Sequence, residues 1–265
     1  MSLQYEKEIE ENEAPHEQAE NAQRAIPVFP LYSAILIACL IAVSLCQFYV
    51  DGQDGILFGG ENSMLAAGFV KPLFEYGQYW RILTGATLHG GLIHLAFNCY
   101  ALYILGKLVE ILSNRAHLAI MFLLATIGGG ILSLIFLPEG VSVGASGGII
   151  GFLGYLTVYG FKRRKLLSNA FLKSMLFNVA FIAFIGIFVL PNIDNYGHLG
   201  GLLTGAIYGI FQISGDVYKD PRQVSKTTKF VGAAALGIFI IISIFSILIL
   251  LGIIQIRIPT LYLPE

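Results

Sequence analysis

Charged residues are scarce in this 265-residue sequence: Asp, Glu, Lys and Arg make up 12% of it, whereas about 25% is usual for a soluble domain. Its 16 Lys and Arg are offset by 17 Asp and Glu, so no positive excess exists to pair with nucleic-acid phosphates. Only three cysteines occur, Cys39, Cys46 and Cys99, each within an apolar run. They are interpreted as small core residues, because neither a disulfide pattern nor zinc-ligand spacing is present.

Apolar residues are abundant instead, at 56% of the chain, with a mean hydropathy of +0.74. This excludes an ordinary cytosolic protein and a disordered chain. Most of the apolar segments are long enough to cross a hydrocarbon core of about 30 Å as helices, although the fourth and sixth are shorter and rich in glycine. The pattern predicts an all-α polytopic membrane protein with seven helices, at about 31–50, 92–112, 117–137, 146–161, 170–190, 198–213 and 230–254.

The polar segments suggest how the chain is divided. Residues 1–28 hold seven glutamates and lack the short basic region that begins a signal peptide, so a solvated tail is expected. The long segment 51–91 contains many apolar and aromatic residues, which predicts a structured outer loop at the membrane interface. The expected division is a tail at 1–28, a six-helix core at 29–214, a basic inner loop at 215–229, and a seventh helix with a short outer tail at 230–265.

The distribution of Lys and Arg predicts the orientation. If the N-terminus is inside, 13 of the 16 basic residues fall on the inner side, and only Lys71, Arg81 and Arg257 fall outside. Short cytoplasmic loops carry such an excess of Lys and Arg. The expected topology has the N-terminus in the cytoplasm and the C-terminus outside.

Polar groups within a membrane are expensive, so each needs a reason. Three clusters stand out, HGGLIHLAFN at 89–98, GASGG at 144–148 and YGHLGGLLTG at 196–205. In the expected topology the second, fourth and sixth helices all begin at the outer face. The side chains of His94, Asn98, Ser146 and His198 are therefore predicted to lie at similar depth.

Glycine spacing suggests how two of these groups meet. The sixth helix has glycine at every fourth residue from 197 to 209, and the fourth helix pairs Gly144 with Gly148 and Gly147 with Gly151. Such faces let helix backbones approach closely in lipid, which would bring Ser146 beside His198. A serine next to a histidine base is the minimum for an activated nucleophile. The alternative is that the glycine faces serve only general helix packing in the membrane, and that the histidine has its hydrogen bonds satisfied without a role in catalysis.

Acyl transfer also needs donors for an oxyanion. His94 and Asn98 share one helix face, and the backbone N–H of Ser146 adds a third donor. The alternative for His94 and Asn98 is a buried hydrogen-bonded pair that locks neighbouring helices. His89 could line a water path, fix the loop or serve packing.

Other site chemistries fit less well. Residues 144–148 match G-x-S-x-G, but that nucleophile motif needs a strand before it and no strand pattern occurs here. His89, His94 and His198 could form a metal site, but H-E-x-x-H is missing and no carboxylate in the spans could act as base. Asp194 lies in a segment typical of a loop and helix cap, so a Ser–His dyad is favoured over a triad.

These residues resemble the rhomboid family of intramembrane serine proteases over about 79–209. The matching motifs are Tyr79-Trp80-Arg81 in the first loop, H-x4-H-x3-N at His89, His94 and Asn98, Gly106 and Glu110 in the second helix, G-x-S-G at Gly144–Gly147, and H-x2-G-x3-G at His198, Gly201 and Gly205. The resemblance implies Ser146 as nucleophile and His198 as general base, with His94, Asn98 and Ser146 forming the oxyanion hole. It implies supporting roles for His89, Gly144, Gly147, Gly201, Trp80 and Arg81.

The resemblance implies single-span membrane proteins as substrates, with small residues at the cut and helix-destabilising residues nearby. It also implies a six-helix core with one additional helix, and neither a cofactor nor a metal is expected. The family often has an aromatic residue one turn after the serine, where this chain has Ile150, so His198 could be held by Phe152 or Tyr155 instead. A prokaryotic plasma membrane is the expected location.

Two other functions remain as alternatives. A catalytically silent relative that binds membrane helices is disfavoured, because a binder has no need of Ser146, His198, His94 and Asn98. A transporter is suggested by the glycine-interrupted helices, but it would want ionisable groups at mid-membrane, and these are missing.

Overall fold

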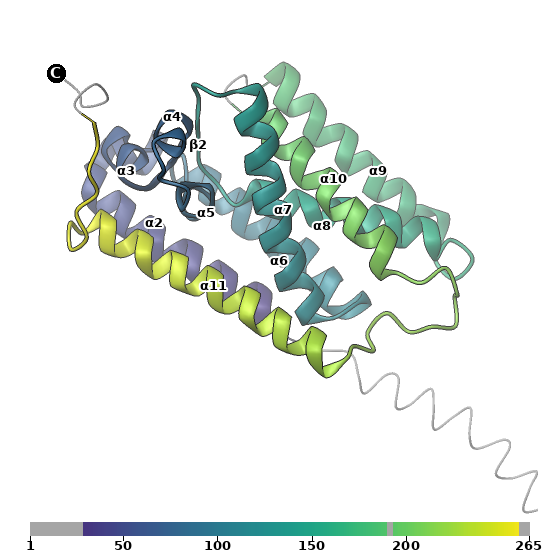
Figure 1. Ribbon diagram of the computed structural model, residues 1–265. Coiled ribbons are helices and arrows are strands. Elements are labelled where there is room, and N and C mark those ends of the chain that lie inside the picture. Colours follow the sequence, from purple (N-terminus) through teal and green to yellow (C-terminus); the bar gives the residue numbers. More distant parts are fainter. Residues whose placement is uncertain (1–28, 190–192, 260–265) are drawn as a thin grey trace, which may run out of the picture.

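The computed structural model describes residues 29–189 and 193–259, and most of them are helical (Figure 1). The acidic tail predicted at 1–28 and the last residues of the outer tail, 260–265, lie outside the described residues. The long helices are α2 (Leu31–Phe58), α6 (Leu92–Leu112), α7 (Arg115–Phe136), α8 (Ser146–Lys162), α9 (Asn169–Phe184), α10 (Asn195–Gln212) and α11 (Lys226–Leu250).

Five segments of the described chain are long and apolar enough to cross a membrane, in α2, α6, α7, α11 and in α9 together with the π-helical turn η2 (Ile185–Val189). The other two helices, α8 and α10, have only 17 and 18 residues. The sequence predicted the fourth and sixth helices to be the short ones. The prediction of an all-α polytopic chain is confirmed.

The first helix follows the predicted segment 31–50 closely. Helix α2 is interrupted at Gly52, where φ is 69° and ψ is −156°, and a short second part continues from there to Phe58. Asp51 accepts a hydrogen bond from the Ser63 N–H at 3.0 Å, which holds the end of α2 to the next helix.

The segment between α2 and α6 is structured, as predicted. It contains α3 (Glu61–Ala67), β1 (Phe69–Val70), α4 (Lys71–Glu75), α5 (Arg81–Thr84) and the 3-10 turn η1 (Gly85–Thr87). Strand β1 pairs antiparallel with β2 (Val141–Ser142), and Phe69 lies opposite Ser142. Because β2 lies just before α8, this pairing attaches the first loop to the chain that leads into Ser146.

Helix α8 lies at the centre of the bundle, packed against α6, α7, α9 and α10. Its contact with α10 depends on glycine. A Cβ at Gly201 would lie 2.8 Å from the carbonyl carbon of Gly147, and a Cβ at Gly205 would lie 2.7 Å from the Cα of Gly151. The glycine faces therefore bring the two helix backbones together, as their spacing predicted.

Helix α11 packs along α2 and α7, and Figure 1 shows it beside α2. It also supports the first loop. The hydroxyl of Thr87 donates to that of Ser246 at 3.0 Å, and the ring of Phe245 meets that of Trp80 edge to face with centroids 5.3 Å apart. The seventh helix thus stabilises the loop that precedes α6.

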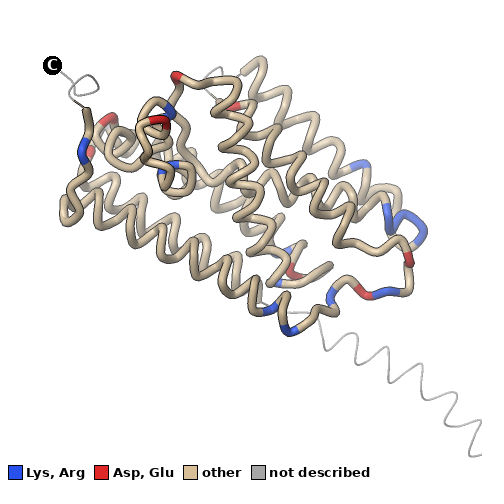
Figure 2. Tube along the Cα trace, in the orientation of Figure 1, with Lys and Arg blue, Asp and Glu red and all other residues tan. Residues whose placement is uncertain are grey.

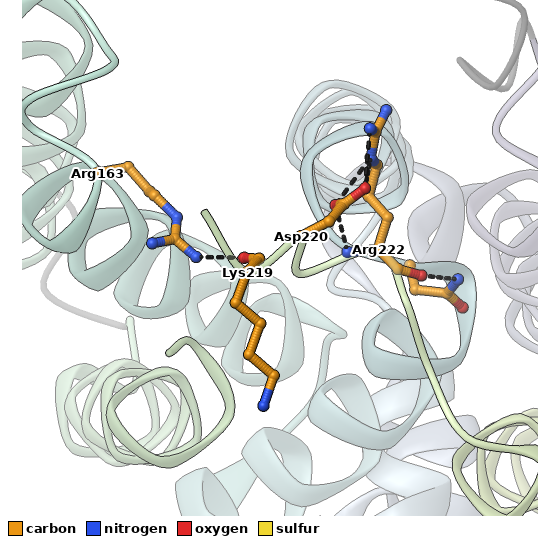
Figure 3. Close-up of polar contacts among 5 residues, drawn as sticks. Arg163, Lys219, Asp220 and Arg222 are labelled. Atoms are coloured by element: carbon orange, nitrogen blue, oxygen red, sulfur yellow. Dashed lines mark hydrogen bonds and ion pairs between the residues drawn. The ribbon is translucent and has the colours of Figure 1, made fainter. Parts of the chain in front are cut away.

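At the other end of the bundle, the connection from α10 to α11 is fixed to the core. Arg163 donates to the backbone carbonyl of Asp216 at 2.8 Å. It also donates to that of Lys219 at 2.8 Å, and Arg222 forms an ion pair with Asp220 at 2.9 Å (Figure 3). Figure 2 shows Lys and Arg gathered at this end, whereas few lie at the end that carries α3 to α5.

Candidate active site

Ser146 and His198 meet where the first turns of α8 and α10 lie side by side. The Nε2 atom of His198 is 2.8 Å from the Oγ of Ser146. Ser146 is the first residue of α8, and His198 lies in the first turn of α10. The glycine contact between the two helices sets this distance. A hydroxyl in hydrogen-bond contact with an imidazole can transfer its proton and act as a nucleophile.

The other ring nitrogen of His198, Nδ1, is buried and has no hydrogen-bond partner among the described residues. Asp194 does not reach it. The Asp194 side chain caps α10 instead, and its Oδ1 accepts the Gly197 N–H at 2.7 Å. The sequence interpretation of Asp194 as a cap is correct, and within the part of the chain that the structure describes no side chain bonds to His198 Nδ1.

The hydrogen bonds of His94 determine which of its nitrogens carries a proton. Nδ1 accepts the backbone N–H of Gly90 at 3.1 Å, so the proton of the neutral ring is on Nε2. That edge of the ring faces the loop before Ser146, because a Cβ on Gly144 would lie 3.0 Å from the Nε2 of His94. His94 therefore presents a donor toward the chain that leads into the serine.

Asn98 lies one turn after His94 and is buried. One N–H of its side-chain amide donates to the His94 carbonyl at 2.9 Å, and the second N–H has no acceptor among residues 29–189 and 193–259. The backbone N–H of Ser146 is also unused by the helix, because the first four N–H groups of a helix have no internal acceptor. The positive end of the helix dipole adds to its effect.

Gly144 adopts a backbone conformation that other residues rarely take, with φ at 121°. A Cβ at this position would also lie 2.7 Å from the Cε1 of His94. Both facts call for glycine. The turn at Gly144 directs the chain into α8 and keeps His94 close to Ser146.

His89 is buried and is held from three sides. Its backbone N–H donates to the side-chain oxygen of Gln47 at 2.9 Å, and its carbonyl accepts from the Gln47 amide at 2.7 Å. Its Nδ1 is 3.2 Å from the hydroxyl of Ser44, and its ring meets that of His94 edge to face, with centroids 5.3 Å apart. Of the alternatives left open, these contacts favour fixing the loop.

Trp80 and Arg81 hold the first loop together. The buried guanidinium of Arg81 donates to Gln78 at 2.7 Å and to the Gly68 carbonyl at 2.8 Å, and it stacks over the Trp80 ring at 4.6 Å. Burial lowers the pKa of Arg81 to about 10. These contacts close the loop on itself.

A cavity of about 440 Å³, counted with its open mouth, lies beside the two residues. Small residues form most of its wall, and Phe69 and Ile82 from the first loop close one side. The lining includes Gly85, Gly129, Gly130, Ser142, Gly148 and Asp194, together with Ser146 and His198. Such a wall leaves space for a small side chain next to the hydroxyl.

The rings proposed as substitutes for the missing aromatic residue pack elsewhere. Phe152 lies against Phe122, and the hydroxyl of Tyr155 is hydrogen-bonded to Ser113 and Gln212 at 2.7 and 2.5 Å. Among the described residues no ring stacks on His198. Ile150 is itself buried, and within residues 29–189 and 193–259 the hydrogen bond made by the His198 ring is the one to Ser146 Oγ.

Two groups near the site were missed by sequence reasoning. Lys71, counted only as a basic residue of the outer loop, is fully buried beside Asp194, and Ser142 bonds to the same carboxylate. Their only signal was a lysine within the apolar stretch FVKPLF.

Across residues 29–189 and 193–259, no group of three or more His, Cys, Asp or Glu side chains is arranged to hold a metal ion.

Comparison with known proteins identifies a shared family. The family model described as Rhomboid domain matches residues 76–215. Rhomboid protease GluP of Bacillus subtilis is 36% identical over 168 residues, covering 62% of this chain and 32% of the relative. RHOMBOID-like protein 6, mitochondrial, of Arabidopsis thaliana is 37% identical over 144 residues, covering 52% of this chain and 45% of the relative.

A third relative, RHOMBOID-like protein 4 of Arabidopsis thaliana, is 34% identical over 140 residues, covering 53% of this chain and 36% of the relative. The chain thus spans between about a third and about a half of the length of these relatives. The matched segment contains the site residues expected from the sequence, from Trp80 to Gly205, whereas Phe69 and Lys71 lie before it.

Proposed function

The chain belongs to the rhomboid family, and on that premise we propose that it is an intramembrane serine endopeptidase with a Ser146–His198 dyad. The observation that carries the proposal is the 2.8 Å contact between Ser146 Oγ and His198 Nε2. The family includes relatives named as proteases, which supports the same reaction class. A protein that only binds membrane helices has no need of this contact.

In the proposed reaction, Ser146 Oγ attacks the carbonyl carbon of a peptide bond while His198 Nε2 accepts its proton. The C–N bond then breaks, and His198 returns the proton to the leaving amine. This leaves an ester between the substrate carbonyl and Ser146. Water attacks the ester with His198 again as base, which releases the acid and restores the serine.

The carbonyl oxygen becomes negative during each attack, and we assign its stabilisation to three donors. These are the backbone N–H of Ser146, the second amide N–H of Asn98 and the Nε2–H of His94. The Gly90 N–H bond to His94 supports this role, because it leaves the proton on the nitrogen that faces Gly144. Donors prepared in advance stabilise the charge without reorganisation.

For substrates, we propose single-span membrane proteins with a small residue at the cut. The glycine-rich wall of the cavity supports this, because a bulky side chain would meet helix backbone there. We further propose a prokaryotic plasma membrane, with the Lys- and Arg-rich end of the bundle in the cytoplasm. In that orientation α8 and α10 begin near the outer side.

Cleavage in liposomes tests the proposal. The purified protein is reconstituted with a single-span substrate that carries small and helix-breaking residues, and the products are identified by mass spectrometry. Cleavage within or next to the span supports the endopeptidase. Correctly folded protein that cleaves none of several such substrates contradicts it and favours the silent relative that binds membrane helices.

Replacing Asn98 by alanine should slow cleavage without abolishing it. Loss of one oxyanion donor costs about 10²–10³-fold in kcat, and KM should change little because the donor acts on the transition state. Asn169→Ala, at the exposed start of α9, is the matched control and should cleave like the parent. Equal cleavage rates for the two variants would contradict the assignment of Asn98 to the oxyanion hole.

A further inference from the structure

One carboxylate beside the site makes contacts with α4, α7 and β2 as well as with the first turn of its own helix, α10. The Oδ2 of Asp194 accepts hydrogen bonds from the hydroxyls of Ser133 in α7 and Ser142 in β2, the latter at 2.6 Å. Its Oδ1 accepts the Gly197 N–H of α10 at 2.7 Å, and the Nζ of Lys71 in α4 lies 4.0 Å from Oδ2. A helix cap alone needs only the Gly197 bond.

The positions of these partners relate the carboxylate to both reacting groups. Ser142 precedes Ser146 by four residues, and Asp194 precedes His198 by four residues. The His198 N–H also donates to the Asp194 carbonyl at 3.0 Å. Asp194 therefore joins the strand that leads into the nucleophile to the helical turn that carries the base.

We call the contacts of Asp194 with Ser142 and with the first turn of α10 the junction. Lys71 connects this junction to the first loop. Its ammonium is buried, has no hydrogen-bond partner among the described residues, and has the Asp194 carboxylate as its neighbouring charge. Its backbone N–H donates to the Gly140 carbonyl at 3.2 Å. Burial lowers the pKa of Lys71 and Asp194 opposes this shift.

The carboxylate itself stays ionised despite its surroundings. Burial alone would raise the pKa of Asp194, but the bonds from Ser133, Ser142 and Gly197, together with the charge of Lys71, lower it below its usual value. A charged acceptor forms stronger hydrogen bonds than a neutral one. The junction is therefore held more tightly than hydroxyl pairs alone could hold it.

We propose that Asp194 is a positioning residue, which fixes the distance between Ser146 and His198 by binding Ser142 on one side and the first turn of α10 on the other. The inference rests on the proposed function, since it concerns the rate of the same reaction. Asp194 acts through the two chains that it joins and touches neither reacting atom.

Replacing Asp194 by alanine tests this. A displacement of about 1 Å between reacting groups costs about 100-fold in rate, so kcat should fall by that order while KM stays nearly constant. Asp216→Ala is the matched control, because Asp216 is exposed and caps only a local turn in the α10–α11 connection. A purely structural cap would lower the melting temperature and leave kcat unchanged, and that result would overturn the proposal.

A second variant keeps the test valid if Asp194→Ala folds poorly. Ser142→Ala removes one bond to the carboxylate and should lower kcat about tenfold, the scale of one hydrogen bond to a charged group. In the Asp194→Ala background the same change should have almost no effect, because the bond is already lost. An unchanged kcat in Ser142→Ala would contradict a shared junction, and so would full and independent losses in both backgrounds where Asp194→Ala does fold.

Labelling with a fluorophosphonate separates the two proposals. In this reaction Ser146 Oγ bonds to phosphorus, fluoride leaves, and His198 takes the proton, so no peptide bond is involved. A parent protein that neither cleaves substrate nor labels at Ser146 defeats the proposed function. A parent that does both, with an Asp194→Ala variant that labels equally fast, defeats the positioning role alone.

Discussion

Alanine in place of Ser146 is expected to reduce cleavage of a single-span substrate by about 10⁴-fold or more, the scale on which loss of a nucleophile affects serine proteases. The reason is that, among the described residues, Ser146 is the one whose hydroxyl forms a hydrogen bond with His198 Nε2, at 2.8 Å. The measurement is the initial rate in liposomes. The melting temperature should stay close to that of the parent, because only one oxygen atom is removed from a partly buried site.

The matched control for this change is Ser168→Ala. Ser168 precedes α9, is exposed, and its side chain makes no capping bond, so this variant should cleave like the parent. His198→Ala should be as inactive as Ser146→Ala, and the double variant should be no worse, because residues that act as a unit are not additive. Full activity in Ser146→Ala would contradict the assignment of Ser146 as nucleophile and His198 as base.

Alanine in place of Gly201 is expected to damage both stability and activity. Its Cβ would lie 2.8 Å from the carbonyl carbon and 3.2 Å from the Cα of Gly147, so α8 and α10 must separate. Overpacking of this kind costs about 1–3 kcal/mol. Because the same contact holds Ser146 next to His198, a shift of about 1 Å would also slow cleavage by about 100-fold.

Gly237→Ala in α11 is the control for this prediction, because a Cβ there meets nothing within 4 Å. Both variants make the same chemical change within a helix. Thermal unfolding in detergent and the cleavage rate in liposomes are measured for each. A Gly201→Ala variant as stable and active as Gly237→Ala would mean that α8 and α10 do not depend on this close approach.

The sequence predicted most of the fold because its signals are local. Apolar stretches of sufficient length predict helices that cross a membrane, and the positions of α6, α7 and α10 differ from the predicted segments by only a few residues. The end of the first helix was also predicted, because DGQDG was interpreted as the start of a loop and α2 is interrupted there, at Gly52; the short helical part from Gly52 to Phe58 was not. The contact of α8 with α10 was also predictable, because a run of glycines at every fourth residue is itself a sequence pattern.

The site was predictable in its residues and not in its hydrogen bonds. Ser146 and His198 were found from helix direction and glycine spacing, and the family membership is confirmed by the Rhomboid domain match. Which nitrogen of His94 carries the proton depends on the Gly90 N–H, a contact with no sequence signature. The catalytic roles of Ser146, His198, His94 and Asn98 stay predictions, which the variants described above test.

By itself, the sequence determined that this chain is an all-α membrane protein, which helices are short, and where small residues allow two of them to touch. These properties follow from composition and spacing along one helix. Only the tertiary structure decided that Lys71, Ser133, Ser142 and Asp194 meet, with the first three residues in contact with the Asp194 carboxylate. They come from α4, α7, β2 and the start of α10, and a contact among four separate segments depends on how the whole bundle packs.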